Sequence, residues 1–169
     1  VTALEGVERE PSLSPDGSQV AFIWNNDLYV KAVDSGEPHR IASNVFETAW
    51  SHDGQWIATF RNVGPPGQHK LLLVAPTGGS EREIGSFHNH AFRSLDWSLD
   101  GKTIALAHKE RPELSPAVFL VEIRTGKTQR ITTPPPEANF DGDPTFSNDG
   151  LRLAYFRNFS TNGIGRFEI

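Results

Sequence analysis

The side chains best suited to bind a ligand lie in four segments of the chain, each shortly before a copy of the tetrapeptide S-x-D-G. They are carboxylates, imidazoles and one guanidinium: Glu8, Glu10, Glu47, His88, His90, Arg93, Asp141 and Asp143. Brought together, these groups could recognise a cationic or polar peptide, or hold a cation with oxygen and imidazole ligands. The alternative interpretation is a solvated rim whose charged groups only make hydrogen bonds within loops.

Motifs for catalysis and cofactor binding are missing from the sequence. There is no cysteine, which removes disulfides, thiolate metal sites and cysteine nucleophiles. There is no phosphate-binding loop, H-E-x-x-H or G-x-G-x-x-G motif, and His88-x-His90 alone lacks the further ligands that a transition-metal site needs. The serines of S-x-D-G do not stand in a G-x-S-x-G elbow. We therefore predict a noncatalytic protein with no cofactor and no metal.

The S-x-D-G motif recurs four times and divides the chain into repeats. Its serines are Ser14, Ser51, Ser98 and Ser147, at intervals of 37, 47 and 49 residues, a period typical of propeller blades. An apolar residue precedes each serine, and a short alternating stretch follows each glycine, as at residues 19–22. Such stretches on both sides of Asp-Gly indicate a hairpin. Because the aspartate recurs in every repeat, we predict that it caps its turn by accepting backbone N–H groups.

Two further strands complete the first three repeats. Each hairpin is followed by an apolar run, at residues 27–31, 70–74 and 117–121, then by a glycine-containing turn and a fourth stretch. Four strands joined by turns make an antiparallel meander, which is a propeller blade. An immunoglobulin-like sandwich is the alternative, but it has no reason to repeat one motif four times at this period. The predicted fold class is all-β, a β-propeller of four-stranded antiparallel blades with helix nearly absent.

The first repeat resembles the TolB-type, WD-like propeller repeat. The family pattern P-x-F-S-P-D-G-x-x-I-A-F, D-I-Y-V, R-L-T is matched by residues 11–22 (PSLSPDGSQVAF), 27–30 (DLYV) and 40–41 (RI). The later repeats keep the serine, aspartate and glycine but replace the proline with His52, Leu99 and Asn148. Such repeats occur in TolB-like periplasmic proteins, in propellers that precede serine peptidase domains, and in extracytoplasmic parts of bacterial winged-helix regulators and kinases.

Counting strands predicts about 3.5 to 4 blades in one propeller segment over residues 1–169. The blades are expected to begin near residues 11, 48, 95 and 144, and the last blade lacks a fourth strand. We expect this segment to belong to a larger propeller, with ring closure within the chain as the alternative. An open propeller exposes strand edges and apolar faces between blades, so self-association is a further expectation.

The order of the turns distinguishes the two ends of the predicted propeller. Tight turns after the first and third strands share one end. Longer connections after the second and fourth strands share the other, at residues 61–69, 86–93, 108–116 and 134–143. Binding groups concentrate on long connections carried by a rigid scaffold. We therefore expect the eight candidate residues to surround the mouth of the central channel at this second end.

Charge limits the range of partners. A net charge of −5 without a run of cations argues against nucleic acid, and no apolar run is long enough for a membrane helix. We predict a recognition platform for a protein, peptide or ligand. By the resemblance it is the extracytoplasmic or periplasmic part of a bacterial signalling or envelope protein, with a cytoplasmic location left open. The alternative is the accessory, substrate-gating propeller of a serine peptidase of the prolyl-oligopeptidase type.

Overall fold

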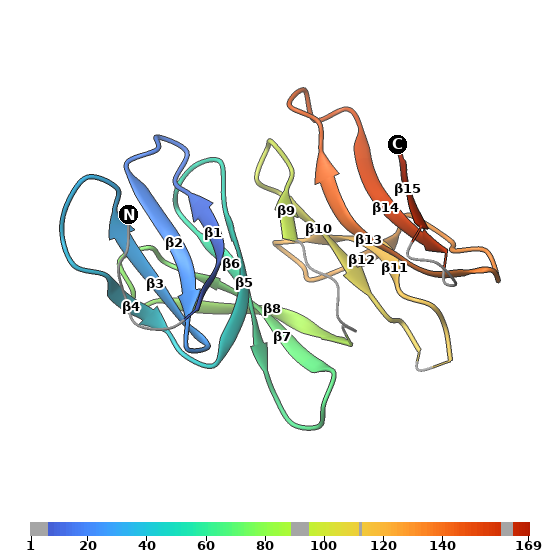
Figure 1. Ribbon diagram of the computed structural model, residues 1–169, viewed down its shortest axis with the longest axis horizontal. Coiled ribbons are helices and arrows are strands. Elements are labelled where there is room, and N and C mark those ends of the chain that lie inside the picture. The colour runs from blue at the N-terminus through green and yellow to red at the C-terminus, as the bar shows by residue number, and fades with distance from the viewer. Residues whose placement is uncertain (1–6, 89–94, 112, 160–163) are drawn as a thin grey trace.

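The computed structural model describes residues 7–88, 95–111, 113–159 and 164–169, with the backbone alone for residues 164–167. These residues form fifteen β-strands and no helix. The strands make four antiparallel sheets that follow one another along the chain (Figure 1). Within these ranges, no helix has the length and apolar character needed to cross a membrane. The predicted all-β fold, a partial propeller, is confirmed.

Each sheet is called a blade and numbered from the N-terminus. Blade 1 contains β1 (Glu8–Leu13), β2 (Gln19–Trp24), β3 (Asp27–Ala32) and β4 (His39–Ala42). Blade 2 contains β5 (Val45–Trp50), β6 (Ile57–Asn62), β7 (Gln68–Val74) and β8 (Glu81–His88). Blade 3 contains β9 (Leu95–Trp97), β10 (Thr103–His108), β11 (Ala117–Glu122) and β12 (Thr128–Arg130). Blade 4 contains β13 (Ala138–Phe146), β14 (Leu153–Phe159) and β15 (Ile164–Glu168). Neighbours in the chain are neighbours in the sheet.

The S-x-D-G motif forms the turn between the first two strands of each blade. In blade 1 the Ser14 hydroxyl donates to Asp16 Oδ1 at 2.6 Å, and the same oxygen accepts the Ser18 N–H at 3.0 Å. Ser14 Oγ in turn accepts the Gln19 N–H at 2.9 Å. Gly17 has a φ of 71°, which glycine adopts without steric cost. Equivalent bonds at the other three motifs confirm that the aspartates cap their turns, and they show that the serines take part in the same turns.

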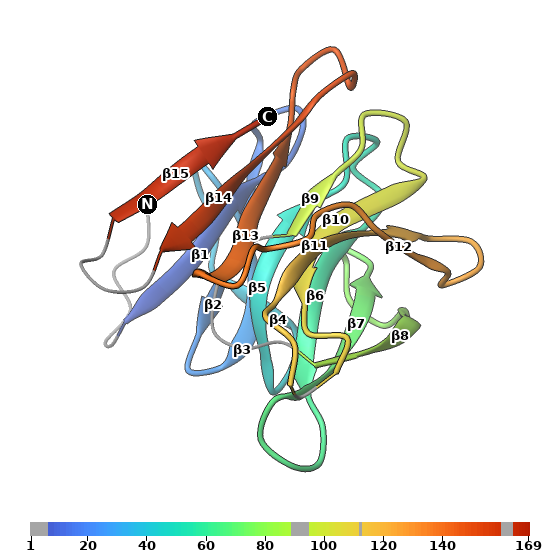
Figure 2. The same ribbon diagram turned by 90° about the vertical axis from the view of Figure 1, so that its right-hand side faces the viewer.

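The first strands of the four blades, β1, β5, β9 and β13, lie next to one another near the middle of the molecule (Figures 1 and 2). A polar side chain two residues before the motif serine joins blade 1 to blade 2 and blade 3 to blade 4. Ser12 Oγ accepts the Trp50 N–H at 3.0 Å. Asp96 Oδ2 accepts the Phe146 N–H at 2.6 Å. These bonds hold consecutive blades in register.

Apolar side chains fill the spaces between blades. One cluster, between blades 1 and 2, comprises Ala21, Ile23, Leu28, Val30, Ile41, Ala42, Val45, Trp50, Ile57, Leu72 and Val74. A second cluster lies between blades 2 and 3 and includes Trp97, which is 2% exposed and donates its indole N–H to the Ala49 carbonyl oxygen at 2.9 Å. The core of the protein thus lies between sheets, and each blade depends on its neighbours to bury its faces.

The first strands of blades 1, 2 and 4 start at Glu8, Val45 and Ala138, whereas the sequence predicts that these blades begin near residues 11, 48 and 144. Strand β9 is described from Leu95. In β1 and β13 the predicted start was a proline, Pro11 or Pro144, and the pairing with the second strand shifts register there. A β-bulge tolerates proline because the bulged residue needs no ladder hydrogen bond, so the strand continues on both sides of it.

Parts of the predicted long connections are strands. Residues 61–62 and 68–69 belong to β6 and β7, residues 86–88 belong to β8, and residues 138–143 belong to β13. The extension of β8 has a packing cause. Phe87 is buried between the rings of Phe60 and His108, with centroids 6.2 and 5.3 Å away. A buried aromatic contact between blades 2 and 3 therefore extends β8 to His88.

Candidate functional site

Three acidic residues occupy the same place in blades 1, 2 and 4, four residues before the motif serine. Glu10, Glu47 and Asp143 have φ angles of 52°, 62° and 49°, in the left-handed region. Each lies where the first strand shifts its register against the second. The equivalent position in blade 3, residue 94, lies outside the described residues. Carboxylates therefore recur at one bulge position on three of the innermost strands.

The backbone at the bulge of blade 1 is held by the neighbouring blade. A positive φ costs a non-glycine residue roughly 1–2 kcal/mol, so it persists only where the surroundings impose it. In blade 1, the Thr48 hydroxyl of blade 2 donates to the carbonyl oxygen of Glu10 at 2.5 Å. Bulges re-aim side chains, and strained residues of this kind cluster at binding sites. The geometry therefore marks these three residues as a candidate site.

The three carboxylates differ in their exposure to solvent. Glu47 is only 6% exposed, whereas Glu10 and Asp143 are partly exposed. All three take part in interactions within the chain, as expected for charged groups that have lost part of their hydration. Access for a ligand is therefore greatest at Glu10 and Asp143, and Glu47 lies deeper between the blades.

Asp141, two residues before Asp143, is engaged in an ion pair. It is fully buried, and its two oxygens accept the Arg157 guanidinium at 2.7 and 2.9 Å. Arg157 also contacts Glu168 at 3.3 Å and the Tyr155 hydroxyl at 3.2 Å. The hydrogen bonds to Asp141 raise the pKa of Arg157 above its ordinary value. Asp141 is therefore a structural anchor of blade 4.

Sequence analysis did not single out Arg157, although a positional signal was present. Glu8 pairs with Trp24 across the first two strands of blade 1, and Asp141 pairs with Arg157 in the same way in blade 4. Each pair joins the residue six before the motif serine to the residue ten after it. Comparing the repeats strand by strand would have placed the guanidinium opposite the carboxylate.

The predicted residue His88 does not join the acidic residues on the first strands. His88 lies at the end of β8, the outermost strand of blade 2. Its backbone N–H donates to His108 Nδ1 at 3.1 Å, and the two rings stack with centroids 6.4 Å apart. Burial lowers the pKa of His108. His90 and Arg93 lie outside the described residues. Within the described ranges, no group of three or more histidine or acidic residues is placed to hold a metal ion.

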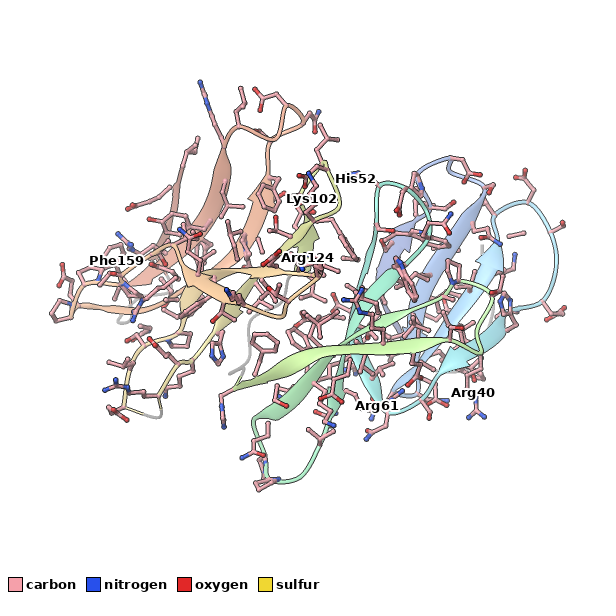
Figure 3. The ribbon with its side chains drawn as sticks, turned by 180° about the vertical axis from the view of Figure 1, so that it is seen from behind. Arg40, His52, Arg61, Lys102, Arg124 and Phe159 are labelled. Carbon is pink, nitrogen blue, oxygen red and sulfur yellow. The ribbon has the colours of Figure 1, made fainter. Side chains whose placement is uncertain are left out.

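Three hollows lie beside the S-x-D-G turns. A cavity of about 210 Å³ is lined by Trp50 and His52, among others. One of about 350 Å³ is lined by residues that include His52, Leu99 and Phe146, and one of about 440 Å³ again by Leu99 and Phe146. Figure 3 shows His52 beside the turn that carries Lys102. These hollows form because the turns project beyond the packed part of the blades (Figure 1).

Comparison with known proteins points to propellers of two kinds. The family described as the dipeptidyl peptidase IV N-terminal region matches residues 3–49. Dipeptidyl peptidase 4 of Felis catus is 22% identical over 143 residues, which is 77% of this chain and 18% of that protein. A putative TolB of Agrobacterium tumefaciens superposes with a TM-score of 0.75 at 23% identity, covering 95% of this chain and 57% of that one. A structure from a study of two prolyl endopeptidases superposes with a TM-score of 0.67 at 14% identity, covering 95% of this chain and 29% of that one.

The chain therefore spans less than two thirds of each of these proteins. At these identities the likeness concerns the fold. It agrees with the repeated turns, the meander of each blade and the packing between blades. On these grounds the chain is a partial β-propeller, and its fold is similar to that of the TolB structures.

Proposed function

We propose that this chain is a noncatalytic recognition platform that binds a cationic or polar peptide segment of a partner protein. The observation that supports this function is the carboxylate at the left-handed bulge of three innermost strands, Glu10, Glu47 and Asp143. Acidic groups on a rigid scaffold attract cations and orient them through charge-assisted hydrogen bonds. The net charge of −5 favours the encounter with a positively charged segment.

The test compares peptides of equal length that are rich in lysine and arginine, neutral, or rich in glutamate. We expect only the basic peptide to bind, with an affinity that falls as salt is added. Glu10→Gln and Asp143→Asn should each weaken binding by about tenfold, because each removes one charge-assisted hydrogen bond of about 1.4 kcal/mol. Isothermal titration calorimetry measures the change.

Glu37→Gln is the matched control, since it makes the same change of charge at an exposed position between β3 and β4. Circular dichroism melts check that each variant is folded. Equal affinity of the Glu10, Asp143 and Glu37 variants, or tight binding of the acidic peptide, would contradict the proposed site.

The likeness to TolB structures supports a place in the extracytoplasmic part of a bacterial signalling or envelope protein. The coding sequence around this segment tests that placement. A winged helix or kinase domain followed by a membrane span, or a secretory leader, would agree with it. Fractionation of cells that express the whole protein gives an independent measurement.

A second function is favoured by the match to the dipeptidyl peptidase IV N-terminal region and by the relative from Felis catus. In this case the propeller is an accessory part of a serine peptidase and controls the access of peptides to its catalytic domain. A G-x-S-x-G nucleophile elbow in the flanking sequence and cleavage of peptides by the whole protein would support this function over the first.

A further inference from the structure

The interface between blades 3 and 4 is filled less completely than the two interfaces before it. The residue just before the motif serine is a tryptophan in blades 2 and 3, and Trp50 and Trp97 are 8% and 2% exposed. Blade 4 has Phe146 at this position, paired with its second strand in the same register. Phe146 is partly exposed. The smaller ring leaves space that an indole fills in the other two interfaces.

Two of the hollows beside the S-x-D-G turns meet at Phe146 and form one groove, which we call the 3–4 groove. Their volumes are about 350 and 440 Å³, and Leu99 and Phe146 line both. Ligand pockets in proteins have volumes of roughly 300–1,000 Å³. The lining residues belong to blades 2, 3 and 4, so the groove is enclosed by consecutive blades of this chain. The described residues that line it do not include Glu10, Glu47 or Asp143.

Leu99 gives the 3–4 groove an apolar wall. It stands between the serine and the aspartate of its motif, where the other motifs have Pro15, His52 and Asn148. Leu99 is 54% exposed, and a Cβ on Gly150 of the next turn would lie 3.5 Å from the Leu99 Cβ. The glycine thus lets the two turns approach closely. An exposed leucine beside a partly exposed phenylalanine is apolar surface that a ligand can cover with a gain in free energy.

The rim of the larger hollow is negatively charged. Asp100 and Asp149 line it. The pKa of each is lowered, at Asp100 mainly by the Lys102 N–H and at Asp149 mainly by the Ser147 hydroxyl, so both are carboxylates at neutral pH. Asp100 Oδ2 lies 3.1 Å from Lys102 Nζ. Within the described part of the chain, both hydrogen bonds to Asp149 end on Oδ1. Asp149 Oδ2 can therefore accept a hydrogen bond from a cationic ligand.

The backbone beneath the 3–4 groove is held in place by Asp96. Its Oδ2 accepts the Phe146 N–H at 2.6 Å and the Thr145 hydroxyl at 3.0 Å, and its Oδ1 accepts the Trp97 N–H at 3.0 Å. Asp96 is thus engaged in fixing blade 4 on blade 3. A groove fixed before the ligand arrives loses little conformational freedom on binding.

We propose that the 3–4 groove binds a peptide segment of a partner protein in which an apolar residue stands beside a lysine or arginine. The apolar side chain covers Leu99 and Phe146, and the neighbouring cation donates to Asp149 Oδ2. Apolar walls next to a carboxylate favour this occupant, because an apolar anchor supplies affinity and a charge-assisted hydrogen bond supplies orientation. This site is separate from the acidic bulges and does not depend on the function proposed for them.

The test uses three peptides of equal length that differ at two central residues in a glycine and serine frame. The first carries phenylalanine and lysine, the second alanine and lysine, and the third phenylalanine and glutamate. Nuclear magnetic resonance titration of the isotopically labelled chain measures affinity and position together. The first peptide should shift the amides of Leu99 and Gly150. The other two should bind at least about tenfold more weakly, because each lacks either the apolar contact or the ion pair.

Three variants test the groove itself. Phe146→Trp places in blade 4 the residue that fills the other two interfaces, and Leu99→Asn introduces the residue that blade 4 has at this motif position. Each should raise the dissociation constant of the phenylalanine–lysine peptide at least about tenfold, because apolar contact is lost. Asp149→Asn should also weaken binding, because the ligand cation loses its charged acceptor.

Each of the two polar variants has a matched control. Leu151→Asn removes a leucine that is 82% exposed and is not among the described residues that line either hollow. Asp53→Asn makes the same change of charge at the same motif position in blade 2. Both controls should bind the phenylalanine–lysine peptide as the unmodified chain does. Circular dichroism melts establish that every variant is folded.

The two sites can fail separately. Glu10→Gln should leave the affinity of the phenylalanine–lysine peptide unchanged, and Leu99→Asn should leave the binding of a lysine-rich and arginine-rich peptide at the acidic bulges unchanged. Equal binding of the three peptides, or an affinity that Phe146→Trp does not alter, would overturn the proposal. Phenethylamine that binds as tightly as the phenylalanine–lysine peptide would also overturn it, because the occupant would then be a small organic cation.

Discussion

At the scale of single residues, Asp16 shows how a fully exposed carboxylate stabilises a turn. Hydrogen bonds, first from the Ser14 hydroxyl and then from Ser18, lower its pKa from 3.8 to about 2. A carboxylate whose pKa is lowered in the folded state stabilises that state at pH values above the pKa that the same carboxylate has in the unfolded chain. That stability is lost as the pH falls from about 4 through about 2. The motif aspartates of the other blades are shifted in the same direction.

We therefore expect Asp16→Asn to lower the unfolding temperature at neutral pH, because the charged acceptor is lost. The difference from the unmodified protein should shrink as the pH falls through the window of about 4 to 2. Thermal unfolding followed by circular dichroism at several pH values measures it. Asp34→Asn, at an exposed position after β3, is the matched control. A constant difference across this window would contradict the role of the charge.

The ion pair between Arg157 and Asp141 gives a second prediction at this scale. Arg157→Leu would leave the fully buried Asp141 without its two-pronged partner. We expect a loss of about 3–5 kcal/mol in the free energy of unfolding, because a buried charge loses its compensation. Urea denaturation measures the loss. Adding Asp141→Asn to Arg157→Leu should recover part of it, and a double variant less stable than the single one would disagree with this account.

At the scale of elements, the turn between β11 and β12 packs against β8 of the preceding blade. Gly126 has a φ of 69°, and a Cβ there would lie 2.6 Å from the carbonyl oxygen of Ile84. The same turn region is bound by Arg82, which donates to the Ile123 carbonyl oxygen at 2.7 Å. The turn therefore joins blades 2 and 3 at their outer strands, and this contact is separate from the contacts between the first strands.

Gly126→Ala should destabilise the protein more than Gly36→Ala does. Both glycines have positive φ, but a Cβ at Gly36 would meet open space. The backbone cost is common to both variants, so the difference reports the collision with β8 and should be at least about 1 kcal/mol. Urea denaturation of both variants measures it. Equal losses would mean that the turn shifts away from β8 without cost.

At the scale of the whole molecule, the repeats determine what could be predicted. The four copies of S-x-D-G were sufficient to predict the hairpin turns, because they act locally within each hairpin. The apolar runs and glycine-containing turns that follow each hairpin were needed to predict the meander and the propeller. The bulges at Glu10 and Asp143 were not predicted, because the following prolines favoured a strand start. The position of His88 depends on the contact of Phe87 with His108 of the next blade, and sequence spacing carries no such information.

The exposure of blade 4 predicts that backbone amides are protected from hydrogen exchange to different extents in different blades. Backbone amides of β14 should exchange with deuterium faster than those of β6, because β14 is partly exposed along its whole length. Mass spectrometry of peptides measures the two exchange rates in dilute solution. Equal rates in dilute solution would show that blade 4 is covered by other means.

Ser12 accepts the Trp50 N–H, and Asp96 accepts the Phe146 N–H. In each of these two hydrogen bonds only the acceptor has to be a particular kind of side chain. The donor is a backbone group that every residue except proline possesses. Mutations can therefore replace the side chain on the donor side without breaking the link, and the acceptor position alone has to remain polar. Blades joined in this way can keep their register while most of their side chains differ, which fits the superposition on a putative TolB at 23% identity.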